Sequence, residues 1–185
     1  MQTWQIAAIC AAAIVVIAAI AYVVYQQRRS RHLREHFGSE YDRTVSDLGD
    51  RRRGESELAR RENRIRKLDI RPLSASDRVR FTEQWQLCQA QFVDDPEGAV
   101  TEAEDLVGGI MSSRGYASDT FEERIADVSA AYPDRARDYR TASDIAERQR
   151  HGMVSTEELR KAFVCYRAIF NELLGGEHEE LKRAS

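Results

Sequence analysis

The pattern His32-Leu33-Arg34-Glu35-His36 is the part of this chain closest to a catalytic motif. On a helix, the H-x-x-E-H spacing places two imidazoles and a carboxylate on one surface, as in a class of zinc proteases. That chemistry needs a large catalytic domain with a further ligand and a closed cleft, and here the neighbouring arginines repel a divalent cation. We therefore interpret these side chains as solvated polar residues and expect no metal site.

The other histidines and the cysteines have no partners at the spacing of a site. His151 precedes a glycine and His178 lies in a polar tail, so both are interpreted as surface residues. Cys88 shares a helical face with Trp85 and Phe92, which predicts a small buried side chain rather than a nucleophile. We find no Gly-rich phosphate loop, C-x-x-C pair or nucleophile elbow. The expectation is no cofactor, no catalytic residue and no enzyme; the alternative is an enzyme site built from scattered carboxylates and tyrosines.

Residues 6–25 form an unbroken apolar run, IAAICAAAIVVIAAIAYVVY, without charge, proline or glycine. At ~1.5 Å per residue, this run is about 30 Å long as a helix, which matches the hydrocarbon core of a bilayer. With Trp4 and Tyr25 at its ends, it predicts a transmembrane helix over residues 4–25. The alternative is a cleaved signal peptide, and hence an exported protein. However, residues 1–5 carry no base, and the run exceeds the usual apolar core of about 7–15 residues.

Four arginines follow the apolar run, whereas no charged residue precedes it. They are Arg28, Arg29, Arg31 and Arg34. Because basic residues stay on the cytoplasmic side and are attracted to anionic headgroups, we expect these four to lie at the membrane surface. The sequence thus predicts a single-pass protein of the bacterial inner membrane, with the N-terminus outside and the C-terminal domain in the cytoplasm.

Charge is divided unevenly along the chain. Of 28 basic and 31 acidic residues, 14 and 9 lie in residues 26–71, so this segment has a net charge of +5 and residues 72–185 one of −8. An acidic domain is repelled by nucleic acid, and we expect no nucleic-acid partner. Arginine accounts for 25 of the 28 basic residues, which we interpret as the base composition of a GC-rich bacterial genome.

Residues 26–71 are predicted to form a basic helical stalk. Five apolar residues recur at steps of four and three, as on one side of a helix. They are Leu33, Phe37, Tyr41, Val45 and Leu48. Beyond Gly49 the pattern fades, which leaves open a solvated stalk, an interrupted coiled coil, or two helices hinged near Gly49 or Gly54. Since large apolar side chains need a partner, we expect this stripe to pack against the distal domain or, as the alternative, against a second copy of the chain.

Residues 72–176 are predicted to form a bundle of four or five helices. Pro72 disfavours helical geometry in the residue before it, which sets the boundary. Helix starts are indicated by Ser74 with Asp77, Asp95 with Pro96, Asp119 with Glu122, and Ser155 with Glu158, and Pro133 restarts a helix. Gly175-Gly176 ends the last helix, and residues 177–185 form a polar tail. No β-alternation occurs, so the predicted fold is all-α.

Three segments, EYDRTV at 40–45, LDIRPLS at 68–74 and FVDDPEGAV at 92–100, resemble an uncharacterised group of bacterial single-pass membrane proteins. The resemblance covers about residues 40–175, and it implies no activity and no functional residues. The expected function is a membrane-anchored helical module or scaffold, whose partners are the lipid bilayer and another protein.

Overall fold

The computed structural model describes residues 3–118 and 120–175, and for residues 3–11 it describes only the helical backbone. The described residues contain no strand, so the all-α prediction is confirmed. The chain divides into two compact units, residues 1–58 and residues 59–185, which we call unit 1 and unit 2.

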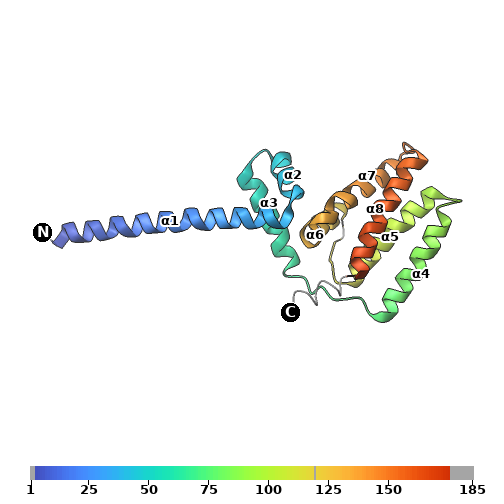
Figure 1. Cartoon of the computed structure of the whole chain (residues 1–185), viewed down its shortest axis with the longest axis horizontal. Coiled ribbons are helices and arrows are strands. Elements are labelled where there is room, and N and C mark those ends of the chain that lie inside the picture. The colour runs from blue at the N-terminus through green and yellow to red at the C-terminus, as the bar shows by residue number, and fades with distance from the viewer. Residues whose placement is uncertain (1–2, 119, 176–185) are drawn as a thin grey trace. The chain divides into compact units, whose positions relative to one another are not determined.

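Unit 1 contains α1 (Thr3–Phe37), α2 (Ser39–Leu48) and the first half of α3 (Arg51–Ile65) (Figure 1). Helices α1 and α2 each end before a glycine with positive φ, Gly38 with φ 50° and Gly49 with φ 63°, of which Gly49 is in the left-handed helical conformation. Side chains disfavour this geometry, and glycine accepts it without cost. The break at Gly49 is one that the sequence suggested, whereas the break at Gly38 lies inside the apolar stripe and was not expected.

The apolar residues of unit 1 pack where the three helices meet. Leu33, Phe37, Tyr41 and Leu58 are each at most 2% exposed. Gly54 lies inside α3 and is no hinge, because a Cβ atom there would come within 2.8 Å of the Val45 Cγ2 atom and 2.9 Å of its Cα atom. The absence of a side chain at Gly54 therefore allows α3 to lie directly on α2.

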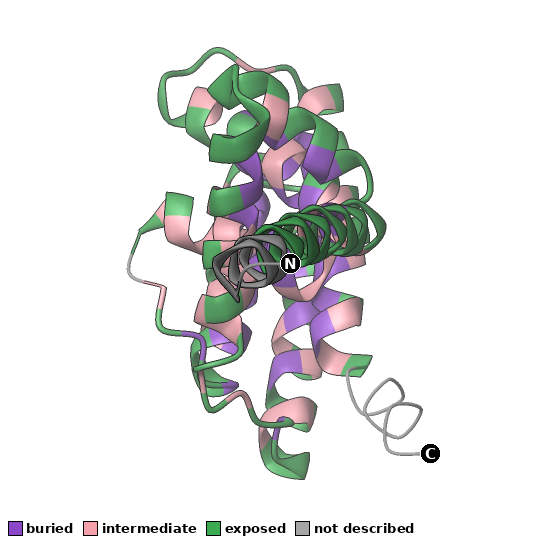
Figure 2. Ribbon diagram, turned by 90° about the vertical axis from the view of Figure 1, so that its left-hand side faces the viewer, coloured by how far each residue is buried: buried purple, intermediate pink, exposed green. Residues whose placement is uncertain are grey.

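Helix α1 passes without interruption through the apolar run. Its large side chains from Ile14 to Tyr25 are between 41% and 67% exposed, and Figure 2 shows these turns as exposed along the helix. Within the part of the chain that the structure describes, no helix is both long enough and apolar enough to cross a membrane.

After the second half of α3, the described residues of unit 2 form five further α-helices and one short 3₁₀ turn, which agrees with the upper of the two predicted helix numbers. They are α4 (Ala75–Gln91), α5 (Pro96–Ser113), α6 (Phe121–Ala131), η1 (Pro133–Arg135), α7 (Ala136–Arg150) and α8 (Thr156–Gly175). Helix α8 packs on both α5 and α7, and α4 packs on α5 (Figure 1). Ile65, Leu68 and Ile70, which follow the unit boundary, pack against the same core.

Aromatic rings hold the centre of unit 2. The Trp85 ring stacks on Phe163 and Phe170, with centroid distances of 5.1 and 4.4 Å. Next to it, Cys88 is 2% exposed and its thiol donates to the Ala99 carbonyl oxygen at 3.2 Å. Burial raises the pKa of Cys88 to about 11. The prediction that Cys88 is a buried core residue is therefore confirmed.

The predicted helix starts are found, with one shift in position. The Ser74 hydroxyl accepts from the Asp77 amide at 3.0 Å, and the Asp95 carboxylate accepts from the Gly98 amide at 2.9 Å. Helix α6 is capped by Thr120, which forms a reciprocal capping box with Glu123. The predicted pair began one residue earlier, at Asp119, which lies outside the described residues.

Candidate functional site

The four arginines predicted to lie at a membrane surface are exposed on α1, which also carries the H-x-x-E-H pattern of His32 to His36. Arg31 Nε lies 2.8 Å from Glu35 Oε1, and the Arg34 guanidinium lies 5.0 Å from the centre of the Tyr41 ring. Arg31 and Arg34 therefore also have partners within unit 1.

The two imidazoles of that motif face each other as rings, with centroids 6.0 Å apart and planes 12° from parallel. His36 also lies edge-on to Phe37 at 4.8 Å. Among the residues described, no group of three or more His, Cys, Asp or Glu side chains is arranged to hold a metal ion. His32 is exposed and His36 is half-buried.

The predicted packing stripe is only partly brought together. Leu33, Phe37 and Tyr41 are buried, Val45 is half-buried, and Leu48 is 43% exposed. Because α1 ends at Phe37, Val45 and Leu48 belong to a different helix from Leu33, and Leu48 faces water. The buried members find their partners within unit 1.

A buried carboxylate lies at the centre of unit 1. Glu55 is 7% exposed, and its Oε1 atom accepts hydrogen bonds from Ser30 Oγ at 2.6 Å, Tyr41 OH at 2.8 Å and Arg51 Nε at 2.8 Å. Arg51 also donates to the Ser30 hydroxyl. One oxygen thus joins α1, α2 and α3, and we call this group the Glu55 cluster.

The Glu55 cluster favours the charged form of its carboxyl group. Burial alone raises the pKa of Glu55, but the hydrogen bonds from Ser30, Arg51 and Tyr41 outweigh it, so the pKa lies below the ordinary value of 4.5. The sequence analysis missed this site. Two of its three donors come from positions 14 and 25 residues away. A glutamate four residues from an arginine is ordinary in a solvated helix.

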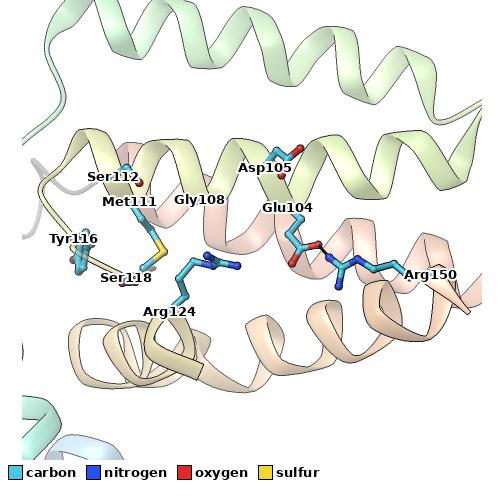
Figure 3. Close-up of a pocket in the computed structure, with 9 residues that line it drawn as sticks. All are labelled: Glu104, Asp105, Gly108, Met111, Ser112, Tyr116, Ser118, Arg124 and Arg150. Atoms are coloured by element: carbon cyan, nitrogen blue, oxygen red, sulfur yellow. Dashed lines mark hydrogen bonds and ion pairs between the residues drawn. The ribbon is translucent and has the colours of Figure 1, made fainter. Parts of the chain in front are cut away.

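A pocket of about 280 Å³ lies along one side of α5 in unit 2 (Figure 3). Helix α6 and the end of α7 form its other walls. The residues that line it are Glu104, Asp105, Gly108, Met111, Ser112, Tyr116, Ser118, Arg124 and Arg150. We call it the α5 pocket.

The α5 pocket contains an ion pair, Glu104 with Arg150, and a further arginine, Arg124. Arg150 Nη2 lies 2.8 Å from Glu104 Oε2, which joins α7 to α5. Burial raises the pKa of Glu104, although Arg150 and Arg124 act in the opposite direction. Arg124 uses its Nε atom to donate to the Tyr139 hydroxyl at 3.3 Å. Sequence reasoning did not find these groups, because they are distant along the chain.

Two adjacent glycines of α5 have different surroundings. The sequence suggested that Gly108-Gly109 marks either a close helix crossing or a helix break. The helix continues through both, and a Cβ atom at Gly109 would lie 3.3 Å from the Phe81 ring. A Cβ atom at Gly108 would meet nothing within 4 Å. Gly109 therefore marks a close contact, whereas Gly108 leaves open space in the pocket wall.

We expect Gly108→Ala to raise the free energy of unfolding of unit 2 by about 0.5–1 kcal/mol, because alanine is the better helix former and has room there. Gly109→Ala is the matched control, and its gain should be smaller, because the new methyl group presses on Phe81. Hydrogen exchange of amides in α5 measures both. Equal gains for the two variants would contradict the assignment of open space to Gly108.

Two further buried charges connect segments of unit 2. Asp127, whose side chain is 1% exposed, lies with Oδ1 3.1 Å from Arg64 Nε and accepts from Ser118 Oγ at 2.5 Å. The Arg64 contact is an ion pair without hydrogen-bond alignment, since Oδ1 has no hydrogen-bond donor in the described residues. Arg114 donates to the Tyr132 hydroxyl at 2.7 Å. Asp127 therefore links α6 to Arg64 and to the loop at Ser118, and Arg114 links the end of α5 to Tyr132. A structural role accounts for both charges.

Comparison with known proteins does not assign the chain to a family. No protein family model, curated protein or solved structure matches the chain.

Proposed function

We propose that this protein is a membrane-anchored helical module, in which α1 enters the bilayer and unit 2 presents a folded domain for a protein partner. The observation that carries the proposal is the exposed apolar surface of α1. Residues 12–25 are all exposed, and none of them is charged.

The exposed surface of α1 runs around the whole helix. Successive residues of a helix are about 100° apart, so the fourteen positions from 12 to 25 face every direction. A protein groove covers one side of a helix, whereas lipid covers all sides. Each large side chain that leaves water contributes roughly 1.5–3 kcal/mol. Lipid is therefore the partner that suits this surface best.

The sequence before these positions supports the same partner. For residues 6–11 the structure describes the backbone alone, but their sequence, IAAICA, continues the apolar run to twenty residues. Twenty residues are the length that a spanning helix needs. The four arginines after the run support a cytoplasmic position for its C-terminal side, next to anionic lipid.

A protein partner is supported by the surface of unit 2. Three aliphatic side chains on or just after α4 are strongly exposed: Val79 at 58%, Leu87 at 71% and Val93 at 83%. The net charge of −8 in residues 72–185 disfavours nucleic acid and anionic lipid as partners of this unit.

We expect the full chain to stay in the membrane fraction after an alkaline carbonate wash and the double variant Val16→Arg with Ile17→Arg to be released. Each arginine near the middle of a spanning helix costs about 2.5–3.5 kcal/mol. Immunoblotting of the washed membranes measures the effect. A reporter fused after Ser185 should be active in the cytoplasm.

The matched control is Leu87→Arg, which adds a charge on the exposed side of α4 and should leave the chain in the membrane. Release of the unaltered chain by carbonate would disprove the anchor. Activity of the reporter only outside the cytoplasm would reverse the proposed orientation.

A further inference from the structure

We propose that the α5 pocket binds a small organic anion, with Arg124 as the residue that holds its carboxylate or phosphate group. This inference concerns unit 2 alone and does not depend on anchoring in a membrane.

The Arg124 guanidinium has N–H donors that make no hydrogen bond to another described residue. A guanidinium carries five N–H donors in a planar fork. Within the described part of the chain, only the Nε donor of Arg124 makes a hydrogen bond, to the Tyr139 hydroxyl. Among the described residues, no carboxylate lies within ion-pair distance of Arg124. Figure 3 shows the guanidinium pointing into the space between Met111 and Glu104. Two terminal nitrogens that face a cavity form the pair of donors that a carboxylate or phosphate accepts.

The other charged residues of the α5 pocket do not prevent Arg124 from binding an anion. Glu104 would repel an anion, but Arg150 lies 2.8 Å from its carboxylate and reduces that repulsion, although Arg150 also pairs with Glu147. Asp105 is exposed at the rim, where water screens it. Arg124 attracts Glu104 at longer range, but no described carboxylate pairs with its guanidinium, so the terminal nitrogens of Arg124 remain available to a bound anion.

The glycine in the pocket wall is a second, independent observation. Glycine inside a helix costs about 1 kcal/mol relative to alanine, and no neighbouring atom at Gly108 requires its small size. Its effect is to widen the cavity beside Arg124. Gly109, by contrast, is explained by its contact with Phe81.

The size and lining of the pocket define the class of ligand. Its volume of about 280 Å³ is just below the ~300–1,000 Å³ of sites for small molecules. Met111 supplies an apolar wall next to the guanidinium. These features fit a small molecule with one anionic group and a short apolar part.

The test is isothermal titration of the full chain in mild detergent with benzoate and with phenyl phosphate, up to about 10 mM, ten times a weak dissociation constant of ~1 mM. We expect one of the two probes to bind. Binding of benzoate assigns a carboxylate ligand, and binding of phenyl phosphate assigns a phosphate ligand.

Variants show whether the bound probe is in the α5 pocket. Arg124→Gln should weaken binding at least tenfold, and Gly108→Leu should abolish it by filling the space. Arg124→Lys keeps the charge but loses the fork, and it should weaken binding also. Arg137→Gln, an exposed arginine of α7, is the matched control and should bind like the unaltered chain.

Thermal unfolding followed by circular dichroism confirms that each variant is folded before titration. Loss of binding in folded Arg124→Gln and Gly108→Leu, with binding kept in Arg137→Gln, supports the proposal. Binding of neither probe overturns it, as does binding that survives in Gly108→Leu or in both Arg124 variants.

Discussion

Trp85→Ala should lower the free energy of unfolding of unit 2 by about 3–5 kcal/mol, the range for removing a large aromatic side chain from a packed core. Trp85 is 6% exposed, and its ring lies between α4 and two aromatic rings of α8. The loss includes the apolar area, the ring stacking and the cavity that remains. Hydrogen exchange of α8 amides, read by mass spectrometry, measures this change in unit 2.

Leu87→Ala is the control for Trp85→Ala. Leu87 lies on the same helix two positions further on, but it is 71% exposed. Its truncation should change the free energy by no more than about 0.5 kcal/mol. If both substitutions had equal effects, α4 would not pack through the side that carries Trp85.

Glu55→Ala should lower the free energy of opening of unit 1 by about 3 kcal/mol, because it leaves the buried hydroxyls of Ser30 and Tyr41 without their acceptor. Unit 1 has a small core, so this loss should increase the exchange of α2 amides by roughly two orders of magnitude. Hydrogen exchange of peptides from residues 39–48 measures it.

The contribution of Glu55 should also depend on pH. Its pKa is lower in the folded chain than the ordinary 4.5. The carboxylate therefore stabilises unit 1 fully above about pH 4.5, and this stabilisation is lost as the pH falls through the lowered folded pKa. Glu55→Gln, which cannot ionise, should remove that part of the acid sensitivity of α2 exchange.

Glu35→Ala is the control for the Glu55 variants. Glu35 also pairs with an arginine four positions away, but its side chain is 66% exposed. Exposed pairs contribute about 0–1 kcal/mol, so exchange in α2 should change little. If Glu55→Ala had as small an effect as Glu35→Ala, the hydrogen bonds of the Glu55 cluster would not hold unit 1 together.

Helix starts could be predicted from the sequence because a cap is a local interaction. The side chains of Ser74 and Asp95 accept hydrogen bonds from amides three residues away, and both caps were predicted from the adjacent sequence. The α6 cap was misplaced by one residue because Asp119 and Thr120 are both residue types that cap helices. Local chemistry thus identified the helix but not its first residue.

The features that were missed depend on distant residues. The stripe at steps of four continues across Gly38, so nothing in the apolar period indicates the turn there; only the positive φ of that glycine does. The Glu104–Arg150 pair joins positions 46 residues apart. The space beside Gly108 exists because α6 and α7 leave it, and the sequence of α5 does not contain that information.

The buried position of Cys88 makes the core accessible to kinetic study by alkylation. A thiol reacts as its thiolate, so burial and a pKa of about 11 protect Cys88 from iodoacetamide in the closed bundle. Labelling at Cys88 then requires α4 to separate from α5. Peptide mass spectrometry of the labelled chain can follow that opening in the full-length protein, without any introduced probe.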